Sequence, residues 1–559
     1  MDKALILESL RQHLQSLEST YTETRCEVDK EWITRICAFI GIPKEGVEIC
    51  EKILSLKPPV PVIWLHMAEC TGCSESFLRL DKPGVESLIF NHISLEYHET
   101  IMGAVGFSAK ELLHNALEKD FILVIEGGVS LGDNAYFMTS GADSVSGEQE
   151  CKEMAECAQA IFAVGTCSSF GGVQAAMPNP THSVGIDTFL TQKVVNIPGC
   201  PPSETNIVGS LIYFILLREL PELDRFNRPL WSYGKNLHDL CERKAKFESG
   251  DFAQSFDDPH LQDGYCLYKV GCKGPYVLNN CPKVKFNARI SWPVRAGHGC
   301  IACSEPNFWD SFGCIEEPLN NENTYIKEPQ RLLSLPIVHS LAEQIPQDTL
   351  TLVLQSNAPT MIYRETYEEI YKDFTSQSPQ NLITCTFEAD FPTLLTFLSS
   401  KNKLSARLVE NYAKWRVQRQ LAEIAMPKVQ GEMSSNMSDI LLLIAQMYGE
   451  DMNALDVASH AQGYLFPHIS KLDMKLTPAY NIEIDKSLRL PLCYLLGGLH
   501  MQGVAYGAIS SICEILSLAL TTLAKTHEIG RVAFKGDMMQ NVLIQDRFRI
   551  YLPQWLEVV

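Results

Sequence analysis

A chain of 559 residues with 46% apolar and 20% charged residues has the composition of a soluble globular protein of roughly two to four domains. Its net charge of −20 argues against a nucleic-acid partner, because binding a phosphate backbone requires a basic face. The 19 cysteines do not suit a disulfide framework, since they occur in C-x-x-C pairs and Gly/Pro-rich loops and a chain this long can build its own core. They indicate metal ligands, in a reducing compartment or loaded with metal before export.

Residues 1–58 are predicted to form a helical N-terminal extension. The leucines near its start follow helical spacing and predict an amphipathic helix: Leu5, Leu7, Leu10, Leu14 and Leu17. Cys26, Cys37 and Cys50 make no ligand pair and are expected to be ordinary thiols. The segment lacks a basic region, an apolar core and a twin-arginine pair, so no export signal is predicted.

Residues 59–225 are predicted to form an α/β domain with a flavodoxin-like, doubly wound parallel sheet. Short apolar runs separated by helix-length segments indicate parallel strands at 61–67, 121–126, 160–165 and 193–198. Each run is followed at once by a loop with functional-looking residues, ECTGCSES, EGGVS, TCSSFGG and GCPPSE. Ligands in such folds bind beyond the carboxyl ends of the strands, so we expect a site there.

The remaining chain is predicted to form an irregular, cysteine-rich iron–sulfur domain over 226–315, ordered by its metal, and a mainly α or α/β domain over 331–559. The polar, Pro-punctuated stretch 315–330 is typical of a linker. Residues 503–524 are apolar and long enough to cross a membrane. Because the segment carries Glu514 and several Ser, Thr and Gly residues, we interpret it as a buried helix instead.

Four cysteines follow the predicted strands and make a first group of candidate ligands: Cys70, Cys73, Cys167 and Cys200. Coming from three neighbouring strand ends, these thiolates can converge on one iron–sulfur cubane. A structural zinc ion is the main alternative, because four cysteines also suit tetrahedral coordination. A dithiol redox role for the C-x-x-C pair is another, but it leaves Cys167 and Cys200 unexplained.

Two further groups lie in the cysteine-rich segment. The second group is His238, Cys241, Cys266 and Cys272, and the third group is Cys281, Cys300 and Cys303. In the second group, one imidazole makes the ligand set less anionic than four thiolates and should raise the potential of a bound cluster. In the third group, Pro293 lies between the cysteines and cannot bind iron, so three thiolates predict a three-iron cluster.

Six motifs in this order resemble the small subunit of nickel–iron hydrogenases of the uptake type, over residues from about 60 to 312: WLHMAECTGCSES, AVGTCSSFGGVQAAMPNPT, NIPGCPPSE, HDLC, CLYKVGCKGPYVLNNCP and SWPVRAGHGCIACSEPNFWD. The resemblance implies a separate large subunit that holds the nickel–iron centre and splits H2. The small subunit then conducts the electrons through three iron–sulfur clusters to an acceptor.

The resemblance assigns a cluster to each group. The first group would hold the proximal 4Fe–4S cluster, the second the distal 4Fe–4S cluster, and the third the medial 3Fe–4S cluster with Pro293 beside it. Glu69 is a candidate proton relay at the subunit interface, the alternative being a helix-start carboxylate bonded to backbone. Gly72 and Gly172 stand where oxygen-tolerant members carry extra cysteines, which implies the oxygen-sensitive form.

The chain also departs from that family. Exported members begin with a twin-arginine signal and often end in a membrane anchor for cytochrome b, whereas this chain shows no such signal and continues into residues 331–559, here called the extension. We therefore expect a cytoplasmic protein, or one bound at a membrane through a partner. The predicted acceptor is a cytochrome b/quinone module or a soluble carrier. An accessory or assembly scaffold derived from the small subunit is the alternative function.

Part of the extension, GRVAFKGDMMQNVLIQDRF (530–548), faintly resembles the C-terminal end of the carbamoyltransferase that matures these hydrogenases. Gln540 and Asn541 match that pattern, but Lys535, Gly536 and Asp537 replace its glycine pair. Asp537 would place a negative charge where a nucleotide phosphate should lie. We therefore expect no working nucleotide site and a docking or assembly role, an unrelated helical domain being the alternative.

Overall fold

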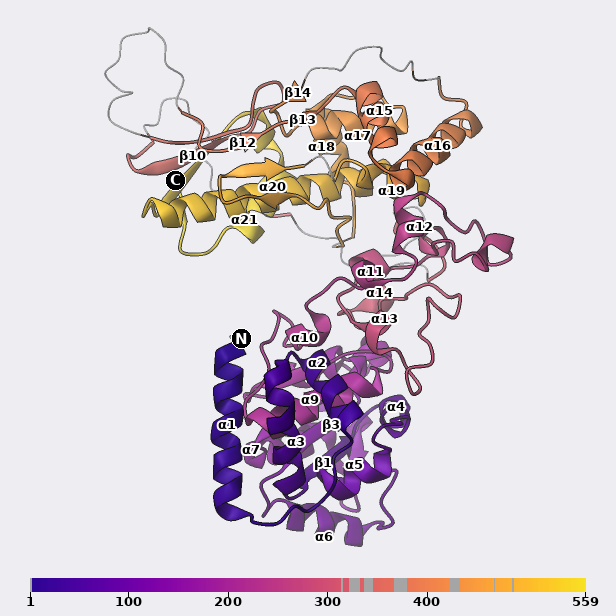
Figure 1. Ribbon diagram of the computed structural model, residues 1–559, viewed down its shortest axis with the longest axis vertical. Helices are drawn as coiled ribbons and strands as arrows, with labels where there is room; N and C mark the ends of the chain where they lie inside the picture. Colours follow the sequence, from indigo (N-terminus) through magenta and orange to yellow (C-terminus); the bar gives the residue numbers. More distant parts are fainter. Residues whose placement is uncertain are drawn as a thin grey trace. The chain divides into compact units, whose positions relative to one another are not determined.

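A computed structural model describes residues 3–312, 315–320, 332–335, 345–365, 380–422, 424, 433–466, 468–484 and 487–559 (Figure 1). The chain divides into two units. Unit 1 comprises Met1–Glu242 and Lys273–Phe312, and unit 2 comprises Arg243–Cys272 and Gly313–Val559. The predicted iron–sulfur segment 226–315 is therefore shared between both units, while most of the predicted linker 315–330 lies outside the described residues.

Unit 1 is built on a five-stranded sheet in the order β2-β1-β3-β7-β9, and every neighbouring pair is parallel. The strands are β1 (Val60–His66), β2 (Ile93–His98), β3 (Ile122–Glu126), β7 (Ala160–Val164) and β9 (Val194–Ile197). The four predicted strands are confirmed, with ends shifted by one residue. The strand β2, at the edge of the sheet, was not predicted. Taken in chain order, the strand order 2-1-3-4-5 is that of flavodoxin-like sheets.

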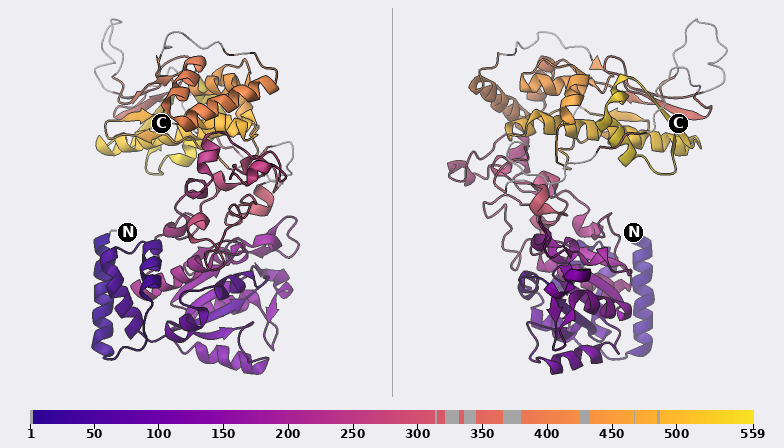
Figure 2. Two further views of the ribbon diagram at one scale, coloured as in Figure 1. Left: turned by 45° about the vertical axis from the view of Figure 1, so that its right-hand side comes forward. Right: turned by 180° about the vertical axis from the view of Figure 1, so that it is seen from behind.

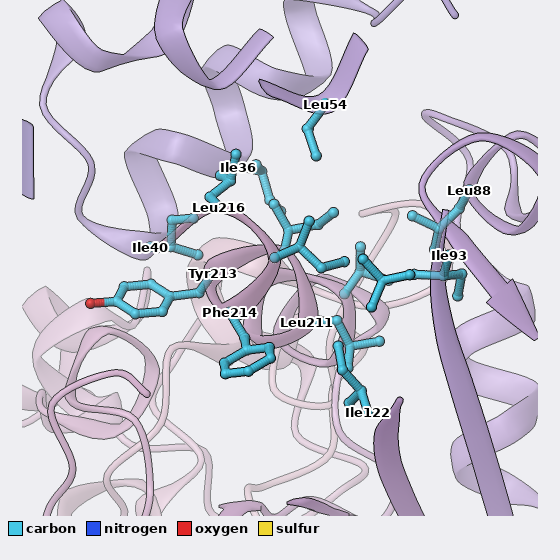
Figure 3. Close-up of a cluster of buried hydrophobic side chains, with 14 of the residues drawn as sticks. Ile36, Ile40, Leu54, Leu88, Ile93, Ile122, Leu211, Tyr213, Phe214 and Leu216 are labelled. Carbon is cyan, nitrogen blue, oxygen red and sulfur yellow. The ribbon is translucent and has the colours of Figure 1, made fainter. Parts of the chain in front are cut away.

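Helices cover both faces of this sheet. Val62 and Trp64 of β1 belong to one buried cluster and Ile63 and Leu65 to the other, as the alternation of a strand requires. The first cluster packs against α2 (Lys30–Ile40), α3 (Val47–Leu56) and α9 (Glu204–Leu217), and Figure 3 shows its side chains pointing toward one another. The second packs against α6 (Phe107–Ala116) and α7 (Gly147–Cys157). Every residue of α9 is buried, because the sheet and the N-terminal helices enclose it.

The predicted amphipathic helix is α1 (Lys3–Thr20), which packs on α3 and α9. Leu10 and Leu17 are buried as expected. Leu5 is 55% exposed, contrary to the prediction, and its neighbour Ile6 is buried instead. The apolar stripe therefore starts one residue later, on the face that meets α9.

Unit 2 mixes helices with small sheets (Figure 2). Its main sheet has the order β11-β10-β17-β18, from β10 (Thr349–Val353), β11 (Met361–Arg364), β17 (Arg531–Lys535) and β18 (Glu557–Val558). Its helices are α12 (Lys244–Glu248), α15 (Phe391–Lys401), α16 (Lys403–Gln418), α17 (Asp439–Tyr448), α18 (Ala454–Ala461), α19 (Leu490–Leu496), α20 (Met501–Thr526) and α21 (Val542–Tyr551). Its second sheet has the order β12-β16-β15, from β12 (Thr384–Cys385), β15 (Lys475–Leu476) and β16 (Asn481–Glu483).

The helix α20 contains the predicted buried segment. Among the described residues it is long and apolar enough to cross a membrane, but 89% of its most apolar window is buried within the protein. Burial of this segment is therefore confirmed. It packs against α17, α18 and α21, so it forms the centre of the helical layer of unit 2.

The segment that resembles the carbamoyltransferase consists of the strand β17, the short helix η10 (Asp537–Gln540) and the helix α21. Asn541 caps α21 by accepting hydrogen bonds from the backbone N–H of Leu543 at 3.0 Å and of Ile544 at 3.3 Å. The Asp537 carboxylate accepts hydrogen bonds from the backbone N–H groups of Ser356 (2.7 Å) and Met538 (2.8 Å). Both backbone N–H groups are therefore already paired with a carboxylate of the protein itself. The resemblance to the carbamoyltransferase itself stays a prediction.

Candidate functional site

The first group lies beyond the carboxyl ends of β1, β7 and β9. Cys70 and Cys73 flank the start of α4 (Gly72–Leu78), Cys167 lies in α8 (Thr166–Phe170), and Cys200 follows β9. Burial, then the charge of Glu126, then the charges of the three other thiols of the group raise the pKa of Cys73 well above its usual range, which places those thiols in the neighbourhood of Cys73. One detail of the prediction was wrong. The strand β3 lies between β1 and β7, so the three strand ends are not all neighbours.

Glu126, at the end of the intervening strand β3, fixes the loop that carries the C-x-x-C pair. Its carboxylate accepts hydrogen bonds from the backbone N–H of Cys73 (2.9 Å) and of Ser74 (3.1 Å). It also accepts from the hydroxyl of Ser74 (2.6 Å) and from Nε1 of Trp64 (3.2 Å). Sequence reasoning missed this residue. The available signal was an acidic residue at the very end of a buried strand, in EGGVS.

Glycines leave room beside three of the four thiols. A Cβ on Gly165 would lie 2.4 Å from Sγ of Cys73, and a Cβ on Gly172 would lie 2.5 Å from Sγ of Cys167. A Cβ on Gly72 would lie 3.2 Å from Sγ of Cys70. Because no side chain fills these positions, the thiols border a cradle that can accept a bulky inorganic group. An all-thiol donor set with such a cradle fits an iron–sulfur cluster.

The thiols of this cradle must lose protons when they bind metal. Burial, followed by the charge of Cys200, raises the pKa of Cys167 to about 11, and burial also raises that of Cys200 to about 11. In the described part of the chain, no three His, Cys, Asp or Glu side chains are close enough to hold a single metal ion.

The third group lies in the last part of unit 1. Burial and then the charge of Cys303 raise the pKa of Cys281, which begins α13 (Cys281–Val284). Cys300 Sγ accepts a hydrogen bond from the backbone N–H of Ala302 at 3.5 Å. Pro293 is exposed, and its carbonyl accepts a hydrogen bond from the backbone N–H of His298 at 3.0 Å. A place for Pro293 beside a cluster stays a prediction.

The first and third groups adjoin each other through Thr166. Its hydroxyl donates to the carbonyl of Cys303 and accepts from the backbone N–H of Gly199 at 2.9 Å. Thr166 directly precedes Cys167 and Gly199 directly precedes Cys200. The charge of Cys303 also contributes to the raised pKa of Cys200, after burial. One side chain therefore holds together loops that carry ligands of two predicted clusters.

The second group is divided between the two units. His238 and Cys241 lie in unit 1, where Asn236 caps the single helical turn α11 (Leu237–Leu240) by accepting from the backbone N–H of His238 at 2.8 Å. The backbone N–H of Cys241 donates to the carbonyl of His238 at 3.2 Å, so both residues lie on one turn. Cys266 and Cys272 lie in unit 2 and are both buried.

Glu69 belongs to a chain of polar side chains rather than to a helix cap. Its Oε1 lies 3.2 Å from Nδ1 of His66 and accepts from the hydroxyl of Thr71 at 3.4 Å. Nε2 of His66 lies 3.3 Å from Nδ1 of His98, whose Nε2 lies 3.2 Å from the hydroxyl of Ser74. Burial, followed by the charge of His66, lowers the pKa of His98 to about 3, so this ring stays neutral. Within the described structure, Oε2 of Glu69 is buried without a hydrogen-bond partner.

Two protein-family models match this chain. The model for the C-terminal part of the "NiFe/NiFeSe hydrogenase small subunit" matches residues 233–316. The model described as "NADH ubiquinone oxidoreductase, 20 Kd subunit" matches residues 70–214. Together they include all three groups of candidate ligands and stop before the extension.

Similar proteins carry related names. The "Quinone-reactive Ni/Fe-hydrogenase small chain" of Wolinella succinogenes is 52% identical over 294 residues, which are 52% of this chain and 83% of that protein. The "Periplasmic [NiFe] hydrogenase small subunit 1" of Nitratidesulfovibrio vulgaris is 44% identical over 286 residues, which are 50% of this chain and 89% of that protein. Among solved structures, the reduced, active Ni-Fe-Se hydrogenase from Desulfomicrobium baculatum aligns with a TM-score of 0.44 and 33% identity, covering 46% of this chain and 99% of that one.

Proposed function

Because this chain belongs to the small subunits of nickel–iron hydrogenases, electron-transferring partners of a large subunit that holds the active site, we propose that its three ligand groups hold three clusters. The first group would bind a proximal 4Fe–4S cluster, the second a distal 4Fe–4S cluster and the third a medial 3Fe–4S cluster beside Pro293. The main support is the convergence of the first group's four thiols around a cradle lined by glycine.

Bound iron–sulfur clusters supply one-electron oxidation and reduction at potentials set by burial and hydrogen bonding. The protein's own contribution is to place the ligands. Glu126 anchors the backbone of Cys73, and Thr166 ties the loop of Cys167 to that of Cys303. Such fixed outer contacts hold ligand geometry and limit reorganisation when charge changes.

We propose that the sheet edge with the first group is the surface that binds the large subunit. Apolar side chains are exposed in the segments that follow β2, β3 and β7: Ile101, Val105, Phe107, Tyr136, Phe137, Val173 and Met177. The carboxyl ends of parallel strands share one edge, so these side chains and the exposed Cys70 and Cys200 belong to the same side of unit 1. Exposed apolar side chains on one side of a domain are typical of a protein–protein interface.

The acceptor is proposed to be a quinone-linked module, since the relative that is 52% identical is named quinone-reactive. A cytochrome b would be the expected membrane component. The chain tagged and purified anaerobically with its partners should contain about eleven iron atoms from its three clusters, besides the iron and nickel of a co-purifying large subunit. Haem in the same preparation would support the cytochrome b assignment. Full iron content without nickel or a large subunit would contradict the electron-transfer role and favour the accessory scaffold.

We propose further that Glu69 passes protons at the subunit interface, with the neutral His98 orienting His66, the hydrogen-bond partner of Glu69. The hydrogen-bonded chain supports this role, as does the buried Oε2 without a partner in the described structure. Glu69→Gln should slow H2-dependent dye reduction about 100-fold, because an amide keeps the hydrogen bonds but cannot take up the proton.

The control for this prediction is Glu75→Gln, a solvated carboxylate on α4 that pairs with Arg79 at 3.8 Å. It should turn over at the wild-type rate. Iron content should be unchanged in both variants, which separates proton transfer from cluster loss. A Glu69→Gln enzyme with wild-type turnover would remove Glu69 from the proton path.

A further inference from the structure

The extension forms one compact unit together with residues from the iron–sulfur segment. Arg243–Cys272, here called the distal segment, belongs to unit 2. Its helix α12 packs against α16 and α19 of the extension. Phe247 of α12 meets the ring of Tyr494 of α19 edge to face, with centroids 5.3 Å apart, and Tyr268 lies 5.8 Å from the same ring. These buried aromatic contacts make the distal segment part of the extension's core.

Polar side chains of the extension reach the same segment. The buried Asp251 accepts hydrogen bonds from Nε of Arg407 (3.3 Å) and from Nδ2 of Asn411 (3.0 Å), both on α16. Nδ2 of Asn411 also donates to the carbonyl of Ser249 at 2.9 Å. Just before α19, Arg489 donates to Glu248 at 2.8 Å. Two guanidinium groups and one amide therefore clamp the turn that follows α12.

This turn holds one of the candidate ligands directly. The carbonyl of Asp251 accepts from the backbone N–H of Cys266 at 3.0 Å, and the carbonyl of Cys266 accepts from the backbone N–H of Ala253 at 3.0 Å. The backbone N–H of Cys266 is therefore attached to the residue that α16 contacts, and its carbonyl to Ala253, two residues further along the same turn. Displacing Asp251 would move Cys266 with it.

The second thiol of the distal segment is held as tightly. The backbone N–H of Cys272 donates to the carbonyl of Leu267 at 3.1 Å, across the turn that contains Tyr268. A Cβ on Gly497, just after α19, would lie 2.4 Å from Cδ1 of Tyr268. A Cβ on Gly271 would lie 2.3 Å from the carbonyl oxygen of Ile315. The ring of Tyr268 therefore packs directly on the backbone of Gly497 in the extension, and Gly271 packs on Ile315, which precedes the extension. A shift of the turn that contains Tyr268 would require the extension to shift too.

We infer that the extension positions the distal cluster: α16 and α19 hold the turn and loop that present Cys266 and Cys272, and Arg407 and Asn411 are positioning residues for the Cys266 thiolate. The inference rests on the proposed assignment of the second group. Contacts one shell outside metal ligands set ligand orientation and change metal affinity by about 10- to 100-fold when removed. The extension therefore controls how firmly the cluster at the electron exit is kept and at what potential it is reduced.

The test compares variants of the full chain, purified anaerobically with the large subunit. In Arg407→Ala/Asn411→Ala, a chelator should remove iron from the distal cluster about tenfold faster or more, and the paramagnetic resonance signal of the reduced distal cluster should change shape and midpoint potential. Signals of the proximal and medial clusters should stay as in the wild type. Lys414→Ala, an exposed side chain on the same helix, is the matched control. Arg407→Lys with Asn411 intact should restore most of the wild-type signal.

The possible outcomes distinguish the positioning role of α16 from the ligand assignment of the second group. A double variant whose distal signal and chelation rate equal those of the wild type overturns the positioning role, while the three clusters still support the proposed function. A wild-type complex with proximal and medial signals but no distal one overturns the ligand assignment and the positioning role with it. If the double variant does not accumulate, Arg407→Ala alone, whose side chain is 42% exposed, is read in the same way.

Discussion

Cys70→Ser is expected to lower H2-dependent dye reduction by the complex by more than about 100-fold, because a hydroxyl replaces one of the four thiolates proposed to hold the proximal cluster. The proximal cluster would be the first electron acceptor after the active site, so its loss interrupts transfer at the start. The measurement is the rate of viologen reduction under H2, with iron content determined on the same preparation. Hydrogen–deuterium exchange between H2 and water should survive, since it needs no electron transfer out of the large subunit.

The matched control for this experiment is Cys157→Ser. Cys157 ends α7, is exposed, and belongs to none of the three ligand groups. It should leave dye reduction and iron content at wild-type values. A Cys70→Ser complex with wild-type dye reduction would show that electrons leave by another route and would contradict the assignment of the first group.

The sheet of unit 1 was predictable where the chain is buried on both sides. The strands β1, β3, β7 and β9 are nearly continuous apolar runs, and burial on both faces of a parallel sheet demands this pattern. The edge strand β2, ISLEYH, carries Ser94 and Glu96 with half-buried side chains and has no such run. Its place in the sheet depends on pairing with β1, which local sequence does not encode.

Motif spacing singled out the three groups of candidate ligands, but it did not reveal the side chains that hold the ligand loops in place. Glu126 bonds to a loop more than thirty residues away in the chain, and Thr166 connects loops of two ligand groups. The residues next to them in the sequence do not indicate which loops they will contact. The same holds for the distal segment. Its packing on α16 and α19 joins residues separated by 156 positions in the case of Asp251 and Arg407. Contacts of this range arise from tertiary packing and leave no periodic signal.

Arg228 is another support that the sequence does not reveal, and its loss should have the largest effect on stability. Its side chain is fully buried and pairs with Asp224 at 2.9 Å and with Glu305 at 3.1 Å. Arg228→Met should therefore lower the free energy of unfolding by about 3–5 kcal/mol near neutral pH, because it leaves a buried carboxylate without its partner. The measurement is the urea midpoint of the anaerobically purified chain. Arg225→Met, an exposed residue stacked on Phe226 at 4.6 Å, should cost less than about 1 kcal/mol.

The loss of stability in Arg228→Met should depend on pH, because Glu305 titrates differently without its partner. Burial raises the pKa of Glu305, and Arg228 opposes that rise. Without Arg228 the folded-state pKa rises further above the unfolded value, so the folded variant binds a proton more tightly than the unfolded chain does. The free energy of unfolding that Arg228→Met loses relative to wild type should thus be largest at neutral pH and should shrink as the pH falls through that raised pKa. If the loss of unfolding free energy is the same at neutral pH and at a pH below the raised pKa of Glu305, Arg228 stabilises the fold by packing alone.

The same guanidinium also connects stability to the third ligand group. Nη1 of Arg228 donates to the carbonyl of Ser304 at 3.1 Å, directly after Cys303, and Glu305 accepts from the backbone N–H of Leu278 at 2.8 Å, near Cys281. The two loops that present Cys281 and Cys303 are therefore joined through one buried ion pair. For this reason Arg228→Met should release iron from the medial cluster at urea concentrations below those that unfold the sheet, whereas Arg225→Met should lose iron only as the sheet unfolds.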